Sequence, residues 1–162
     1  QFPQSHGRAT NSLVELVDLF PTIADLAGLP PLNESPPLEG VSMAPLFRDP
    51  GAPLKSAVFG QYAHRRCANN PLIKDKDCVK NLFMGYSVRT SSHHYVRWCR
   101  LADDTGRVPI WEPAQGLELY TDLSDASGGL MNVERTNLAY DPAYQAIVDQ
   151  LDATLRAHFA TV

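Results

Sequence analysis

Proline constrains the fold of this 162-residue chain more than any other residue type, because seven of the thirteen prolines lie within residues 30–53. They stand at positions 30, 31, 36, 37, 45, 50 and 53. Each proline lacks an amide donor and fixes φ at about −65°, which breaks helix interiors and central strands. We therefore expect an extended connector over 30–53 without a long regular element. Its apolar anchors are Leu38, Val41, Met43, Leu46 and Phe47.

A helix is predicted before this connector, over residues 12–28. Ser12-Leu13-Val14-Glu15 has the pattern of a capping box, which places the helix start at Ser12. Gly28 provides a left-handed stop, and Pro21 predicts a kink or two abutting helices. Apolar residues at intervals of three and four form one stripe. They are Leu13, Leu16, Val17, Phe20, Ile23, Ala24 and Ala27.

After the connector the apolar period changes from helical to alternating, which is typical of strands. The sequence predicts strands over residues 57–62, 83–90, 94–101 and 117–120. The second and third are separated by only three residues, so we expect them to form a hairpin. One face of that hairpin should carry Met84, Tyr86 and Val88 together with either Tyr95 or Val96.

A last helix is predicted to begin at Asp141-Pro142 and to lie on the sheet. Its apolar stripe consists of Tyr144, Ile147, Val148, Leu151, Leu155 and Phe159. Its polar residues are expected to face outward, namely Asp149, Gln150, Asp152 and Arg156.

Composition and charge exclude several classes of protein. The chain is 44% hydrophobic, which is too apolar for a disordered protein, and its net charge of −4 does not favour a nucleic-acid partner. No apolar run approaches the roughly 18 residues of a membrane span. Because the chain starts at Gln1 in a polar segment, we expect its N-terminus to be a cut edge.

The cysteines and one sequon bear on the compartment. Cys67 and Cys78 bracket a polar stretch, and a disulfide between them would add about 2–3 kcal/mol, although two unpaired thiols remain the alternative. Cys99 lies in an alternating run and is expected to be a small buried hydrophobic residue. Asn33 begins a glycosylation sequon, which would agree with an oxidising compartment.

The sequence assigns no catalytic residue and no metal ligand in this chain, because neither an activated nucleophile nor a ligand cluster is evident. Basic residues are the remaining candidates: His64, Arg65, Arg89, Arg97 and Arg100. Each could hold an anionic sugar or pair with an acid of a neighbouring element. Arg89 is flanked by apolar strand residues, so we expect it to have a specific partner.

Several segments resemble, in order, motifs of the sulfatases of the alkaline phosphatase superfamily. Residues 13–29 contain Asp-Leu-Phe-Pro-Thr and Leu-Ala-Gly, and residues 39–46 contain Gly-x-Ser-x-x-Pro-Leu. Residues 118–123 contain Glu-Leu-Tyr followed by Asp-Leu. Residues 84–90 and 95–98 are similar to the iduronate-2-sulfatase branch in particular. The chain thus resembles the C-terminal portion of such an enzyme.

This resemblance implies an α/β protein that is α+β within these residues. Residues 1–55 would be a late helix and the proline-rich connector of a large α/β domain. Residues 56–162 would be the C-terminal subdomain, a small antiparallel sheet of about four strands closed by a C-terminal helix. The family's nucleophile motif, Cys-x-Pro-Ser-Arg, is missing from the chain. The resemblance therefore implies that formylglycine and calcium, the family's cofactors, are held by an N-terminal catalytic part, which is the partner of this chain.

The implied function is sulfuric ester hydrolysis on sulfated sugars of the glycosaminoglycan type, in glycosaminoglycan degradation, in a lysosomal, secreted or periplasmic location. The chain would complete the fold and shape the substrate rim, with His64, Arg65 and Arg89 contacting a polyanionic sugar. One alternative is a phosphate or phosphonate monoester hydrolase of the same superfamily. Another is a non-catalytic α+β interaction module. The module predicts that Leu13, Leu16 and Phe20 are covered, whereas the fragment predicts an exposed apolar patch on the first helix and the connector.

Overall fold

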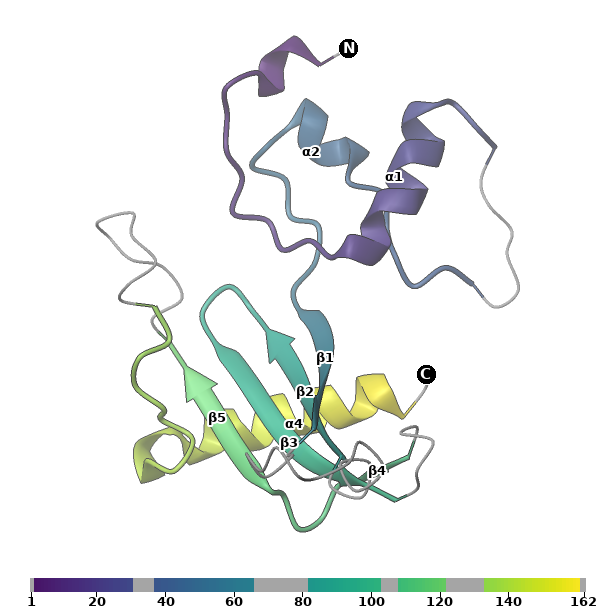
Figure 1. The fold of residues 1–162 in the computed structure, drawn as a ribbon. Helices are drawn as coiled ribbons and strands as arrows, with labels where there is room; N and C mark the ends of the chain where they lie inside the picture. The colour runs from purple at the N-terminus through teal and green to yellow at the C-terminus, as the bar shows by residue number, and fades with distance from the viewer. Residues whose placement is uncertain (1, 31–36, 66–81, 103–107, 122–132, 161–162) are drawn as a thin grey trace, which may run out of the picture. The chain divides into compact units, whose positions relative to one another are not determined.

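The computed structural model describes residues 2–30, 37–65, 82–102, 108–121 and 133–160 (Figure 1). Contacts within the chain group it into two units, Gln1–Val58 and Phe59–Val162. The assignment of residues 1–55 to a large domain and of 56–162 to a C-terminal subdomain stays a prediction. Asn33, Cys67 and Cys78 lie outside the described residues. No helix in the described ranges is long and apolar enough to cross a membrane.

The first unit contains four short helical segments: η1 (Pro3–Ser5), η2 (Leu16–Asp18), α1 (Leu19–Leu26) and α2 (Ala44–Arg48). The α2 helix lies within the proline-rich connector, with Pro45 in its first turn, where the missing amide donor has no partner to lose. The prediction that the connector is extended throughout is therefore wrong. No long helix or strand lies in its described part, which agrees with the other half of the prediction.

The predicted helix start at Ser12 is wrong. The Ser12 hydroxyl donates to the Ala52 carbonyl at 2.7 Å, and the helical residues begin four positions later. The capping box is made instead by Glu15 and Asp18, whose Oδ2 accepts the Glu15 amide at 2.8 Å. Pro21 causes no break, because it lies in the first turn of α1. Of the two predicted outcomes, the abutting helices η2 and α1 are the one observed.

Gly28 ends α1 as predicted. Its φ is +69°, the left-handed region that glycine enters without steric strain. The Leu29 amide donates to the Ala24 carbonyl and the Gly28 amide to the Asp25 carbonyl, both at 3.0 Å. This pair of bonds is a Schellman motif, which satisfies carbonyls at the helix end.

Asp18 ties the helix to the connector. Its side chain is fully buried and accepts hydrogen bonds from the Val41 amide at 2.8 Å and the Lys55 ammonium at 2.7 Å. Gly40 is required nearby, since an added Cβ would lie 2.0 Å from the Val17 carbonyl oxygen. Burial alone would raise the pKa of Asp18, but its bonds from Lys55 and the two amides hold the pKa below its ordinary value.

The apolar stripe of η2 and α1 faces away from the contacts of its own unit. Leu16, Phe20 and Ile23 are 86%, 58% and 65% exposed, whereas Thr22 and Ala24 are buried. The segment thus buries small and polar residues and leaves its large apolar side chains uncovered. This is the exposed patch that the fragment interpretation predicts.

The second unit is built on an antiparallel sheet with the strands β1 (Val58–Arg65), β2 (Leu82–Arg89), β3 (His94–Leu101), β4 (Pro109–Ile110) and β5 (Gly116–Tyr120). The order is β1-β2-β3-β4, and β5 also pairs with β3. The four predicted strands and the β2–β3 hairpin are confirmed. The two-residue β4 was not predicted, because so short a strand has no alternation to detect.

The helix α4 (Gln145–Phe159) covers one face of the sheet (Figure 1). Its start is as predicted: Asp141 Oδ1 accepts the Ala143 amide at 2.9 Å and caps a short turn, η4 (Pro142–Tyr144). Val148, Leu151 and Leu155 are buried in α4. The sheet residues buried with them are Tyr86, Val88, Tyr95, Cys99 and Leu119.

The register decides which residues share the buried face. Val88 pairs with Tyr95 and Tyr86 pairs with Arg97, so Tyr95 rather than Val96 lies with the apolar face. Cys99 on the same face is fully buried, as predicted, and burial raises the pKa of its thiol.

Candidate functional site

One candidate site lies on the sheet face opposite α4, at the end where β2 meets β3. Arg89 pairs with His94, and His94 pairs with Tyr120, so the three residues form one row across β2, β3 and β5. Side chains in such a row stand about 5 Å apart and can contact one another. The His94 and Tyr120 rings lie 6.4 Å apart between centroids.

Glu134 is the acid that completes this row. Its Oε1 lies 3.0 Å from Arg89 Nη1 and 2.8 Å from His94 Nδ1. The expectation of a specific partner for Arg89 is therefore confirmed. Glu134 could not be found from the sequence, because 45 residues separate it from Arg89 and no pattern links them.

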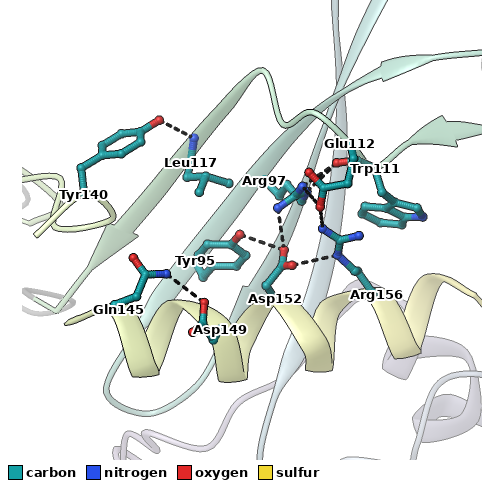
Figure 2. A network of polar contacts seen from close by, with 10 residues as sticks. All are labelled: Tyr95, Arg97, Trp111, Glu112, Leu117, Tyr140, Gln145, Asp149, Asp152 and Arg156. Atoms are coloured by element: carbon teal, nitrogen blue, oxygen red, sulfur yellow. Dashed lines mark hydrogen bonds and ion pairs between the residues drawn. The ribbon is translucent and has the colours of Figure 1, made fainter. Parts of the chain in front are cut away.

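A second charged group lies between the sheet and α4 (Figure 2). Arg97 donates to Asp152 Oδ1 at 3.1 Å and to the Trp111 carbonyl, and pairs with Glu112 at 2.8 Å. Tyr95 donates to the same Asp152 oxygen at 2.9 Å. Arg156 reaches Asp152 Oδ2 at 2.8 Å.

The prediction that Asp152 and Arg156 face outward is therefore wrong. Both lie on the flank of α4 that meets the sheet, where Tyr95 and Arg97 supply a donor and a charge that an apolar pattern does not reveal. The Arg97 side chain is only 5% exposed, so its guanidinium is occupied by acids of this chain. The two roles expected for Arg97 were binding an anionic sugar and pairing with an acid of a neighbouring element, and the structure shows the pairing.

The pKa values in this group follow from burial and the crowding of charges. Burial, followed by the hydrogen bond to Asp152, raises the pKa of Tyr95 well above its ordinary value. Burial alone would lower the pKa of Arg97, but the nearby Tyr95, Asp152 and Glu112 raise it overall. These shifts keep Tyr95 neutral and Arg97 charged at neutral pH.

The other basic candidates are distributed differently. His64 and Arg65 end β1, and their side chains lie outside what the structure describes. Arg100 is exposed on the same sheet face as Arg89. The structure thus brings Arg89 and His94 together, and the contact of His64, Arg65 and Arg89 with a polyanion stays a prediction.

Trp98 lies on this face as well, between two glycines. Gly85 and Gly116 are its partners on β2 and β5. A Cβ at Gly85 would lie 2.9 Å from the Trp98 ring, which shows that the ring rests directly on that strand. Trp98 Nε1 donates to Glu118 at 2.7 Å. The sequence does not reveal this packing, because strand alternation concerns only side chains and glycine has none.

Neither a metal site nor a nucleophile is found among the described residues. No group of three or more His, Cys, Asp or Glu side chains in those ranges could hold a metal ion. Cys99 is buried with a raised pKa, which disfavours the reactive thiolate. The described residues therefore do not fit the calcium and formylglycine that the sulfatase resemblance implies.

No family model matches the chain, but curated proteins and solved structures do. The chain is 37% identical to the iduronate 2-sulfatases of Homo sapiens and Mus musculus over 111 residues, covering 57% of this chain and 20% of each relative. It also matches the structure of a 2-O GAG sulfatase, with a TM-score of 0.55 and 25% identity over 89% of this chain and 24% of that one. Over these residues the chain is similar to sulfatases.

A further structural match bears on the fold of the chain. The phosphonate monoester hydrolase of Agrobacterium radiobacter has a TM-score of 0.58 and 24% identity, over 98% of this chain and 28% of that one. At this identity the match shows a shared fold only. The chain spans about a fifth of the curated relatives and about a quarter of the matched structures.

Proposed function

We propose that this chain is the C-terminal part of a sulfuric ester hydrolase of the iduronate-2-sulfatase type. The 37% identity to iduronate 2-sulfatases carries the proposal. The substrate would be a sulfated sugar of the glycosaminoglycan type, and the location would be lysosomal, secreted or periplasmic. Residues that perform the reaction would lie in an N-terminal part of the same protein, because the chain lacks the motif Cys-x-Pro-Ser-Arg. Formylglycine and calcium would be held there.

The exposed patch of the first unit supports a partnership with another part of the protein. Leu16, Phe20 and Ile23 follow one another at intervals of four and three, so they lie on one side of the helical segment. An uncovered apolar stripe of this kind is typical of a protein–protein contact. This observation favours a part of a larger enzyme over a self-sufficient interaction module.

The proposed role of this chain is to complete the fold and to shape the rim of the substrate site. His64, Arg65 and Arg89 would contact a polyanionic sugar there. Arg89 supports this role because its side chain is 38% exposed and already binds a carboxylate. A guanidinium presents paired donors to carboxylate and sulfate oxygens alike.

Hydrolysis of a phosphate or phosphonate monoester is the second candidate function. The fold shared with a phosphonate monoester hydrolase favours it as much as the fold shared with a sulfatase favours the first. Fold alone therefore does not separate the two esters.

The test is an ester panel with the full-length protein. A sulfated disaccharide, a phosphate monoester and a phosphonate monoester are supplied at equal concentrations, and the released anion is quantified. The proposal expects sulfate release to be fastest. Faster release from the phosphate or phosphonate ester would replace it with the second candidate.

A further inference from the structure

The paired donors Arg89 and His94 converge on a single oxygen. Glu134 Oε1 lies within hydrogen-bond distance of both Arg89 Nη1 and His94 Nδ1. The two donors are direct register partners on β2 and β3, so the sheet fixes their spacing before any anion is bound. This is the geometry of a preformed oxyanion site, and a carboxylate of the chain itself fills it.

All three side chains are within reach of solvent. The exposed fractions are 38% for Arg89, 21% for His94 and 31% for Glu134, in contrast to 5% for the buried Arg97. Ion pairs at such exposure contribute little to stability, because water competes with both partners. An anion from solution could therefore take the place of Glu134 at small cost.

The backbone of Glu134 is strained. Its φ is +54°, and it is the one non-glycine residue with positive φ among those described. Residues held in the left-handed region without being glycine are uncommon and gather at functional sites. Glu134 also belongs to a segment outside the sheet, so its carboxylate can leave the site without disturbing the strands that carry Arg89 and His94.

We infer that Arg89 and His94 form a binding site for an oxyanion of a sugar, and that Glu134 occupies this site as an exchangeable internal ligand. The ligand is a uronate carboxylate or a sulfate group, because each presents a negatively charged oxygen that can accept hydrogen bonds from both donors. The inference takes its substrate class from the proposed function and goes beyond it by adding His94 as a ligand-binding residue and Glu134 as the competitor.

The test compares Glu134→Gly with the unchanged full-length protein in calorimetric titrations. Glycine suits the left-handed backbone, so the variant removes the competing carboxylate without adding strain. The probes are a non-sulfated uronate disaccharide, inorganic sulfate, and a neutral disaccharide. Glu39→Gln, at an exposed position in the first unit, is the matched control for the loss of one negative charge.

We expect Glu134→Gly to bind the uronate or sulfate about threefold more tightly, the effect of removing an exposed competing ion pair. Arg89→Lys should bind the same probe about fivefold more weakly, because lysine cannot present the planar fork. Tightening with the uronate alone, with sulfate alone or with both identifies which oxyanion is bound. The neutral disaccharide and Glu39→Gln should show no change.

Unchanged affinity for both anions in Glu134→Gly would overturn the inference, as would equal tightening of the neutral disaccharide. Glu134→Gln, which keeps the size of the side chain, guards against a folding defect and should tighten binding in the same direction. Hydrolysis of sulfate esters is measured separately. Altered anion binding without hydrolysis contradicts only the proposed function, and hydrolysis with unaltered binding contradicts only this inference.

Discussion

At the scale of single residues, two arginines on the same hairpin have different environments. Arg97 faces α4 and is enclosed by Asp152, Glu112 and the Trp111 carbonyl, whereas Arg89 lies on the opposite face beside Glu134. The difference follows from the pleat, which sends residues on paired strands to one face or the other according to register. Alternation predicted that the hairpin has two faces. It could not predict that an arginine would stand on the apolar one, since that depends on acids distant in the sequence.

Arg97→Met should destabilise the second unit by about 3 kcal/mol, because it leaves the partly buried Asp152 carboxylate with one cation fewer and the Trp111 carbonyl without its donor. Urea unfolding followed by circular dichroism measures the change. Arg100→Met, at an exposed position of the same strand, is the control and should shift stability by less than about 0.5 kcal/mol. A loss for Arg97→Met no larger than for this control would show that the group in Figure 2 contributes nothing to stability.

The stability of the first unit depends on pH through Asp18. Since the pKa of Asp18 is held below its ordinary value of 3.8, its ionised form stabilises the folded state above that value. This contribution decreases as the pH falls below about 4, and it is lost once the pH is below the lowered pKa.

Asp18→Asn should remove this acid dependence and cost about 3 kcal/mol at neutral pH, because Lys55 loses a buried charge partner. Urea unfolding at a series of pH values from 7 to 2 is the measurement. Asp25→Asn, at an exposed position in the adjoining helix α1, should retain the acid dependence. An unchanged pH profile in Asp18→Asn would contradict the role given to this carboxylate.

At the scale of elements, periodic segments were predicted well and their ends less well. The strands β2, β3 and β5 and the helix α4 follow from alternation and from a stripe at helical spacing, which are local properties of the sequence. The start of the first helix did not follow, because the Ser12 hydroxyl is used by a carbonyl 40 residues away. Long-range hydrogen bonds of this kind also hide the Glu134 partner of Arg89 from a reading of the sequence.

Gly85→Ala tests how closely the sheet face opposite α4 is packed. The added methyl group would lie 2.9 Å from the Trp98 ring, so the ring must shift and the unit should lose about 1–3 kcal/mol. Gly116→Ala is the matched control on the other flank of the same ring, where the added group would make an ordinary contact at 3.5 Å. Thermal unfolding of both variants decides the point, and equal losses would contradict the packing described here.

At the scale of the whole molecule, the chain is similar to one part of the sulfatases that it matches. It spans about a fifth of the length of the curated relatives. The resemblance seen in the sequence is confirmed by both relatives and structures. Neither the identity of the sugar nor the residues of the substrate rim could be predicted as specifically from the sequence, since both depend on residues outside this chain.

The exposed stripe of the first unit should be detectable when the 162-residue chain is studied alone. Replacing Leu16 and Ile23 by serine removes large exposed apolar side chains and should roughly halve the fluorescence of a bound hydrophobic dye. Tyr140→Ser, at a 69% exposed position of the second unit, is the control and should leave the fluorescence unchanged. Equal dye binding by all three proteins would argue against a concentrated apolar surface on η2 and α1.

We propose that this chain completes a sulfate-ester hydrolase and does not itself contain the reacting groups. The most direct measurement is sulfate release from a 2-O-sulfated uronate disaccharide, with the full-length protein and the 162-residue chain at equal molar concentration. Our account predicts release by the full-length protein and none above background by the chain alone. Sulfate release by the isolated chain, or no release by the full-length protein, would contradict it.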